Sequence, residues 1–148
     1  MYVAELMTKN AMTCRPDQPV HSAAQIMWDH DCGCVPVVDE TNTIQGMITD
    51  RDVCMAALMQ GKSLSEISVG SAMSRAIYGC SPNDDIEKAA ELMRVRQIRR
   101  VPVLDEQGHV LGVLSLGDFA RALSRSASNG VSSPTVARTL FDISQPGA

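Results

Sequence analysis

The stretches Gly46-Met47-Ile48-Thr49-Asp50-Arg51-Asp52 and Gly112-Val113-Leu114-Ser115-Leu116-Gly117-Asp118 decide the fold, because they share one pattern. Each begins with a glycine, runs through apolar residues to a hydroxyl residue, and reaches an aspartate three positions later. This pattern predicts a strand that leads directly into a helix, with Thr49 or Ser115 as the N-cap. Free backbone N–H groups at such a helix start favour an anion such as phosphate, and the carboxylate can accept hydrogen bonds from sugar hydroxyls. For either stretch alone, a plain helix cap is the alternative interpretation.

The whole chain repeats itself with an offset of 66 residues and without gaps. The offset aligns Met7 with Met73, Cys14 with Cys80, and Asp52 with Asp118. Two tandem copies are therefore predicted, at residues 1–62 and 63–126, followed by a flexible linker and a short C-terminal helix within residues 127–148. Two copies favour a pseudo-symmetric pair, because a solenoid needs at least about three repeats to bury its faces.

Each copy predicts the order β-α-β-β-α, which makes an α+β fold with helices on one face of a sheet. In the first copy these elements are a short strand at 13–15, a helix capped by Asp17, strands at 33–39 and 44–49, and a helix that ends near Gly61. In the second copy they lie at 77–80, 83–97, 99–104 and 109–115, followed by a last helix. Pro36 and Pro102 fall inside strands, which predicts an edge position or an irregularity.

Composition excludes several classes of protein. The formal charge of −4 argues against a general nucleic-acid binder, whose surface would be basic. No apolar run approaches the length of a membrane span, and the start of the chain lacks a signal peptide, so no membrane partner and a cytoplasmic location are expected. An odd number of cysteines, five, fits reduced thiols in that compartment. We find no nucleophile-and-base pair and no Walker-type loop, so no enzymatic activity is expected.

A family resemblance rests on a second repeated motif. The run Val35-Pro36-Val37-Val38-Asp39 precedes the first of the two stretches above, and Val101-Pro102-Val103-Leu104-Asp105 precedes the second. Together these motifs resemble a tandem CBS-domain pair, or Bateman module, over about residues 1–125. The Thr-Asp-Arg-Asp of the first copy is similar to small stand-alone bacterial hypoxic- or stress-response CBS proteins. The resemblance implies pseudo-two-fold packing of the copies, with adenine nucleotides or related ligands bound in the clefts between them.

Two composite sites follow from the resemblance. In the first, Asp52 would accept the ribose hydroxyls, and Thr49 and Arg51 would meet phosphate. The other residues of this site would be Met47, Ile77, Tyr78, Ile98, Arg99 and Arg100. The second site would take Val113, Ser115, Asp118, Ala11, Met12, Cys32, Gly33 and Cys34.

The second site is expected to hold phosphate more weakly than the first. Gly117 stands there in place of Arg51, and Gly33 and Cys34 replace Arg99 and Arg100. Arg94 and Arg96 are interpreted as solvated cations late in a helix, where they suit the dipole.

The sequence thus predicts a non-catalytic regulatory module that binds AMP, ADP or ATP, or a relative such as NAD or S-adenosylmethionine, with no metal. One alternative is a thiol or metal sensor centred on Cys32 and Cys34, with His30 nearby. The pair also fits small hydrophobic residues on one face of a strand, and this structural interpretation is preferred. The other alternative is a purely structural dimerisation module.

Two further predictions concern helices. Those that follow the two stretches carry small and apolar residues on more than one face, which predicts a homodimer. In the tail, Ser133-Pro134 predicts a helix start. Val136, Leu140 and Phe141 would then form the apolar stripe that docks on the body of the chain or on a partner subunit.

Overall fold

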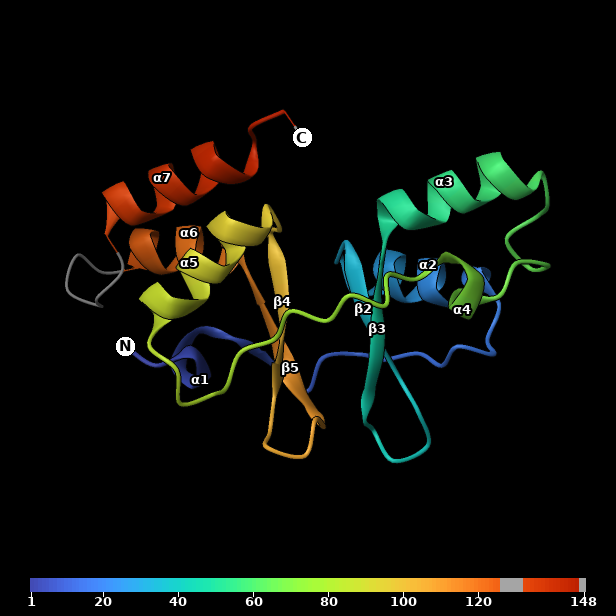
Figure 1. Cartoon of the computed structure of the whole chain (residues 1–148), viewed down its shortest axis with the longest axis horizontal. Coiled ribbons are helices and arrows are strands. Elements are labelled where there is room, and N and C mark those ends of the chain that lie inside the picture. The colour runs from blue at the N-terminus through green and yellow to red at the C-terminus, as the bar shows by residue number, and fades with distance from the viewer. Residues whose placement is uncertain (126–131, 147–148) are drawn as a thin grey trace. The chain divides into compact units, whose positions relative to one another are not determined.

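The computed structural model describes residues 1–125 and 132–146, so residues 127–131 of the predicted linker lie outside the described residues. The predicted α+β class with two repeats is confirmed (Figure 1). In chain order the elements are α1 (Val3–Leu6), β1 (Thr8–Lys9), α2 (Val20–Asp29), β2 (Cys34–Val38), β3 (Ile44–Thr49), α3 (Asp50–Gln60), α4 (Val69–Ala72), α5 (Ile86–Arg96), β4 (Arg100–Leu104), β5 (Val110–Ser115), α6 (Leu116–Arg125) and α7 (Ser133–Ile143).

The chain forms two compact units that do not coincide with the two sequence copies. Unit 1 contains Met1–Asn10, Tyr78–Glu106 and the described residues from Leu111 onward, whereas unit 2 contains Ala11–Ile77 and Gln107–Val110. The opening segment of the first copy, residues 1–10, therefore belongs to unit 1, which holds the β4–β5 hairpin of the second copy. The opening segment of the second copy, residues 63–77, belongs to unit 2, which holds the β2–β3 hairpin of the first copy. Neither α1, β1 nor α4 was expected from the sequence, because elements of two to four residues carry no periodicity.

Backbone hydrogen bonds hold each opening segment in its unit. In unit 1, Val3 N donates to Asp84 O at 2.9 Å, and Ile86 N donates to Met1 O at 3.1 Å. The corresponding bonds of unit 2, displaced by 66 residues, join Val69 N to Gln18 O at 2.8 Å and Val20 N to Ile67 O at 2.7 Å. Val3 and Val69 are fully buried, so each opening segment also adds to the core of its unit.

Each core is built from branched and small apolar side chains, with few aromatic residues, as the composition requires. In unit 1 the largest fully buried side chains include Phe119, Ile86, Met93 and Leu114. In unit 2 they include Ile48, Ile67, Val20 and Val35. These residues come from the inner faces of the helices and from alternate positions of the strands, so the helices cover one face of each sheet.

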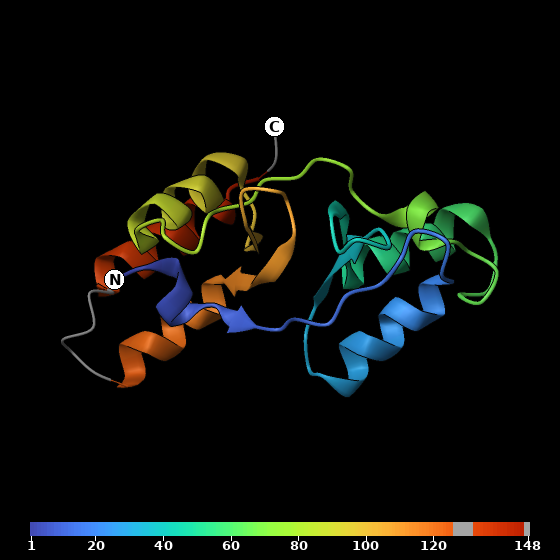
Figure 2. The same ribbon diagram turned by 90° about the horizontal axis from the view of Figure 1, so that it is seen from below.

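A close crossing of two backbones lies at the glycine that begins each repeated stretch. In unit 1, β1 lies beside β5 (Figure 2) and pairs with it antiparallel. Thr8 is opposite Val113. In unit 2, Ser74 pairs with Met47 of β3 in the same way. A Cβ atom on Gly46 would overlap the carbonyl oxygen of Ser74, and one on Gly112 would overlap that of Thr8. Both positions therefore require glycine, because backbone cannot move aside as a flexible side chain can.

The two short strands expected at 13–15 and 77–80 are reduced to single bridges, Cys14 with Val37 and Cys80 with Val103. Asp17 does not cap α2, because the helix starts at Val20 and its N-cap is Pro19. The irregularity predicted near Pro36 is present, since the β2–β3 register shifts between Val37 and Val38.

The predictions for the helix that follows β3 are accurate. Thr49 caps α3, and Gly61 ends it in the left-handed region at φ 61°.

The predicted C-terminal helix is present as α7 and packs on α5 and α6 of unit 1 (Figure 1). Its N-cap is Ser132 rather than Ser133. The predicted stripe is wrong in part, because Leu140 is 48% exposed and Phe141 is 66% exposed. Thr139 and Ile143 are the buried residues, since positions 139 and 143 lie one helical turn apart on the face that meets α5 and α6.

We expect Gly46→Ala and Gly112→Ala each to lower the free energy of unfolding by about 1–3 kcal/mol, because the added Cβ must displace backbone in a well-packed sheet. Urea denaturation followed by circular dichroism measures this change. Gly117→Ala is the matched control, since its Cβ would meet only the end of Arg121 at 3.3 Å and Ser115 Oγ at 3.5 Å. Alanine in a helix is favoured over glycine, so the control should match or exceed the wild-type stability. Equal stability of all three variants would contradict the crossing.

Candidate functional site

The first predicted helix start lies in unit 2, where β3 ends at Thr49 and α3 begins at Asp50. Asp52 N donates to Thr49 Oγ1 at 3.2 Å, and Thr49 N donates to Asp52 Oδ2 at 2.9 Å. These two bonds form a capping box, so Asp52 has the structural role that the alternative interpretation gives it. Among the described residues, no hydrogen bond or ion pair is found for Asp52 Oδ1. The half-buried carboxylate thus keeps one acceptor oxygen for a ligand.

The second helix start, in unit 1, has the same capping geometry but a fully engaged carboxylate. Ser115 N and Ser115 Oγ donate to Asp118 Oδ2 at 2.7 and 2.8 Å, and Asp118 N donates to Ser115 Oγ at 3.3 Å. The other oxygen, Oδ1, accepts a charge-assisted hydrogen bond from the guanidinium of Arg121. Asp118 is only 6% exposed. An incoming ribose must therefore compete with Arg121 for this carboxylate.

Sequence reasoning did not identify Arg121. The signal was available, because Arg121 lies three positions after Asp118 on one helix, a spacing at which side chains meet. The corresponding residue of the first copy is Met55, which offers Asp52 no charge. The two repeated stretches therefore share their backbone but differ in the charge beside the aspartate.

The strand that follows α2, β2, begins beside the first helix start. In unit 2, Cys34 of β2 pairs with Thr49, and Asp50 N donates to Gly33 O at 3.1 Å. Unit 1 repeats this geometry, because Leu116 N donates to Arg99 O at 2.9 Å. Gly33 and Cys34 were assigned to the second site, yet within their own unit they lie next to residues of the first.

The predicted site residues divide between the units as follows. Unit 2 holds Met12, Cys32, Gly33, Cys34, Met47, Thr49, Arg51, Asp52 and Ile77, and unit 1 holds Tyr78, Ile98, Arg99, Arg100, Val113, Ser115 and Asp118. Each composite site takes residues from both units, so both composite sites stay predictions. Arg51, Arg99, Met12 and Cys32 are exposed, and Arg100, Tyr78, Ile77 and Ile98 are half-buried.

Arg94 and Arg96 lie in the last turn of α5, as predicted, and Arg96 is exposed, but both also have partners within the chain. The Arg96 guanidinium lies over the Tyr78 ring, 4.4 Å from its centroid, in a cation–π arrangement. One face of Tyr78 is therefore covered by Arg96. Arg94 donates to Thr139 Oγ1 at 3.2 Å and pairs with Asp142 at 4.0 Å, so it holds α7 in place. Both contacts depend on residues distant in the sequence, which helix periodicity does not reveal.

The cysteines fall into two groups. Cys14, Cys34 and Cys80 are buried, whereas Cys32 and Cys54 are exposed. Burial raises the pKa of the Cys14 thiol to about 11 and that of Cys80 to about 12. In the described part of the chain, no group of three or more His, Cys, Asp or Glu side chains is arranged to hold a metal ion.

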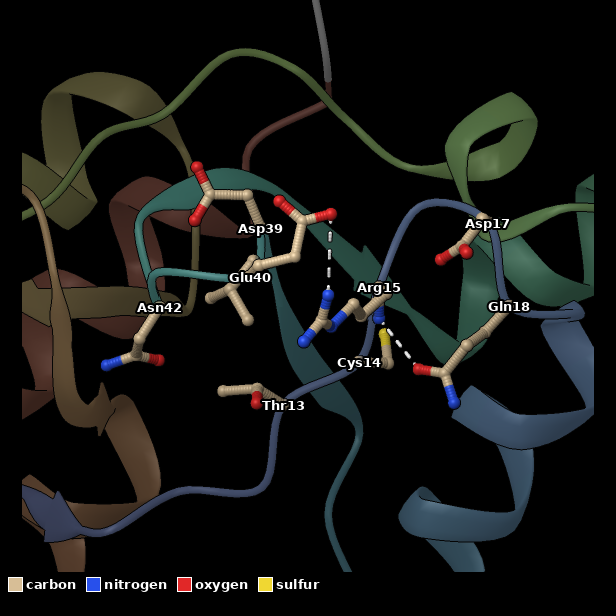
Figure 3. Close-up of a pocket in the computed structure, with 9 residues that line it drawn as sticks. Thr13, Cys14, Arg15, Asp17, Gln18, Asp39, Glu40 and Asn42 are labelled. Carbon is tan, nitrogen blue, oxygen red and sulfur yellow. Dashed lines mark hydrogen bonds and ion pairs between the residues drawn. The ribbon is translucent and has the colours of Figure 1, made fainter.

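A polar hollow of about 550 Å³ lies at the opposite end of β2 from Gly33, within unit 2 (Figure 3). Arg15 and Glu40 face each other across it at 3.6 Å, and both are exposed. The pKa of Asp39 is lowered, first by the hydrogen bond from the Thr41 hydroxyl and then by that from Thr43 N. None of the predicted site residues lines this hollow, and the Asp39 carboxylate is engaged with Thr41 and Thr43 of its own loop.

Comparison with known proteins identifies the family. The sequence model of the CBS domain matches residues 3–58 and 66–125, so the chain belongs to the CBS domain family, as the repeated motifs predicted. The chain is 36% identical over 118 residues to CBS domain-containing protein YhcV of Bacillus subtilis, covering 80% of this chain and 82% of that protein. It is 30% identical over 128 residues to hypoxic response protein 1 of Mycobacterium tuberculosis, covering 86% and 89%.

Two solved structures extend the comparison. The CBS domain pair of protein MJ0100, in complex with 5′-methylthioadenosine and S-adenosyl-L-methionine, has a TM-score of 0.76 and 26% identity, with coverage of 84% of this chain and 96% of that chain. Hypoxic response protein I with two coordinated zinc ions has a TM-score of 0.74 and 29% identity, with coverage of 82% and 98%. Within the described ranges 1–125 and 132–146, we identify no helix with the length and hydropathy of a membrane span.

We expect an alkylating reagent at pH 8 to modify Cys32 and Cys54 rapidly and Cys14 and Cys80 slowly. The thiolate is the reactive form, and burial keeps Cys14 and Cys80 protonated at that pH. Mass spectrometry of peptides sampled over time measures each rate. Cys32→Ala and Cys54→Ala should each remove one rapidly labelled site. Rapid labelling of Cys14 in folded protein would contradict its buried position.

Proposed function

We propose that this chain is a non-catalytic regulatory module that binds an adenine nucleotide or a related adenosine-derived ligand, with Asp52 as the ribose-binding residue. The observation that carries the proposal is the uncommitted Oδ1 of Asp52 beside a capped helix start. A carboxylate oxygen is a good acceptor for two adjacent sugar hydroxyls. The adenosine-derived ligands of the MJ0100 pair support this class of ligand, since both contain a ribose joined to adenine.

Phosphate recognition is the finer part of the proposal. Thr49 and the exposed Arg51 lie at the N-terminus of α3, where backbone N–H groups and the helix dipole favour an anion. Arg99 and Arg100 would add cations from the second copy, as the family resemblance implies. The preference for AMP, ADP or ATP over uncharged adenosine compounds depends on these arginines.

The second site is proposed to be the weaker one. The sequence argument was that Gly117 replaces Arg51. The structure adds support of a different kind, because Arg121 occupies the carboxylate oxygen of Asp118 that corresponds to the uncommitted oxygen of Asp52. The homodimer predicted from the surplus apolar helix faces is part of the same proposal.

A zinc-linked function is the second candidate, favoured by the two zinc ions in hypoxic response protein I. Cys32 and His30 are both exposed near the start of β2 and are the side chains to test. Metal analysis of protein purified without chelators distinguishes this candidate. Stoichiometric zinc that disappears in Cys32→Ala would favour it over the nucleotide proposal.

The main test is a thermal-shift panel of AMP, ADP, ATP, NAD, NADH and S-adenosylmethionine on wild type and Asp52→Ala. Ligand at about 100 times its Kd stabilises the folded state by about 2.7 kcal/mol, and Asp52→Ala should abolish most of that gain. Asp50→Ala is the matched control, because Asp50 carries the same charge on the same helical turn but its carboxylate accepts from Arg51 N, at 2.9 Å, and not from the capping residue Thr49. The control should keep the wild-type shift. Equal shifts in Asp52→Ala and wild type would overturn the proposal.

Asp118→Ala should reduce the response less than Asp52→Ala, because its site is already the weaker one. The unliganded stability of Asp52→Ala should fall by about 0.5–1 kcal/mol, since the capping box loses one partner with or without ligand. A larger ligand-specific loss in Asp118→Ala would reverse the ranking of the two sites.

We expect Arg121→Met, which installs the residue found in the first copy, to strengthen ligand binding at the second site. The substitution releases Oδ1 of Asp118 for the ribose. Isothermal titration calorimetry with the ligand selected in the panel measures the weaker of the two binding steps. Combining Arg121→Met with Asp118→Ala should remove the gain, and a gain that persists in the double variant would contradict this role of Arg121.

A further inference from the structure

The contact between Arg96 and Tyr78 in unit 1 joins a cation to an aromatic ring. The Arg96 guanidinium lies 4.4 Å from the centroid of the ring and covers one of its two faces. Tyr78 is half-buried, and within residues 1–125 and 132–146 no hydrogen bond is found for its hydroxyl group. An aromatic ring can stack on both of its faces, so a flat ligand group can use the face opposite Arg96.

The end of α5 holds Arg96 at a fixed position. The next residue, Gln97, is left-handed at φ 53°, and its N–H is shared between Met93 O and Arg94 O. Ile98 N donates to Met93 O at 3.0 Å, which closes the helix. Arg96 is exposed, and in the described ranges it has no carboxylate partner. The Tyr78 ring is therefore the group with which this guanidinium interacts.

The backbone that carries Tyr78 is fixed on its C-terminal side. Cys80 N donates to Pro102 O at 3.1 Å, and a Cβ atom on Gly79 would lie 3.2 Å from the same oxygen. The chain thus runs close to β4 directly after Tyr78, which leaves the side-chain torsions as the main freedom of the ring. Arg96 restricts these torsions, so the ring is held in place before any ligand arrives.

The contact lies among predicted ligand residues of the same unit. Cys80 forms a parallel bridge with Val103, and two residues earlier in this register Tyr78 lies beside the start of β4. Arg100 begins β4, and Arg99 precedes it. The base-binding tyrosine and the arginines expected to meet phosphate are therefore close together within unit 1.

The first copy lacks this pair. At the offset of 66, Met12 corresponds to Tyr78, and His30 corresponds to Arg96. Met12 is 46% exposed and offers no aromatic face. Because the first copy has the same fold without the pair, the contact is not needed to form the unit. The site predicted to be the stronger takes Tyr78, whereas the weaker one takes Met12.

We propose that Arg96 is a positioning residue for the first ligand site. It holds the Tyr78 ring from one face, and the adenine base stacks on the opposite face. Arg96 acts through the ring and does not touch the ligand phosphate. This inference rests on the proposed function, because it assigns a residue to recognition of the base by the same site.

The first test measures the binding of adenosine and of AMP by isothermal titration calorimetry. Arg96→Met should raise the Kd of both ligands by one factor, about 3–5-fold, because the same base must order the freed ring in each case. Arg96→Lys keeps a cation for the ring and should bind adenosine more tightly than Arg96→Met. Arg138→Met is the matched control, since exposed Arg138 of the same unit pairs with Asp142 and not with a ring. It should bind both ligands as the wild type does.

The second test removes the ring. In a Tyr78→Leu background, Arg96→Met should cause no further loss of affinity, because two residues that act through one contact are not additive. Nuclear magnetic resonance checks the contact without ligand. The side-chain protons of Arg96 should be shifted upfield by the ring in the wild type, and the shift should disappear in Tyr78→Leu.

Three results would overturn the inference. They are a larger loss for AMP than for adenosine in Arg96→Met, a loss that persists in the Tyr78→Leu background, and unshifted Arg96 protons in the wild type. A wild type that shows the upfield shift but binds no adenine compound would instead refute the proposed function, and the base-binding role with it.

Discussion

The fold depends on one close backbone crossing, which occurs twice. At Gly46 and at Gly112 the opening segment of one copy passes against the hairpin of the other, with a carbonyl oxygen where a Cβ atom would lie. The crossing allows Thr8 to pair beside β5 and Ser74 beside β3. Because each opening segment also buries Val3 or Val69 in the other copy's core, neither copy completes a core from its own residues alone. Tandem duplication is thus a structural requirement of each unit.

The same duplication supplies two helix starts whose capping boxes are nearly identical in geometry but differ in chemistry. A capping box needs only the hydroxyl, the aspartate and the local backbone, so both copies retain it. The free acceptor capacity of the aspartate depends on residue 55 or 121, which capping does not constrain. A methionine at one position and an arginine at the other give Asp52 an uncommitted oxygen and Asp118 an ion pair. A duplicated fold can in this way preserve the same structure in both copies and leave a different charge beside the aspartate of each.

A second departure from the internal symmetry is α7. It packs on α5 and α6 and is hydrogen-bonded to Glu87, Arg94 and Gln97 of α5 and its C-terminal end, none of which the first copy retains. The first copy instead has an exposed tryptophan in α2 and a run without charged residues, Val53–Gln60, in α3. The helix faces of the two repeats therefore differ, because α7 packs on that of unit 1.

The sequence by itself determined the features that depend on neighbouring residues and on the repeat. These are the two copies, the α+β class, the caps of Thr49 and Ser115, the end of α3 at Gly61, and the family. The repeat offset, the periodicity and the capping residues can all be recognised in the sequence without knowing which distant residues are in contact. Only the tertiary structure decided which copy receives each opening segment, that Arg94 and Arg96 have partners, and that Ile143 rather than Phe141 faces the body. Each of these depends on contacts between residues far apart in the chain, and a local pattern leaves several partners equally possible. The pairing of Arg121 with Asp118 could have been predicted from the sequence, since the i, i+3 spacing is local. Its importance depends on the tertiary structure, in which both oxygens of Asp118 accept hydrogen bonds.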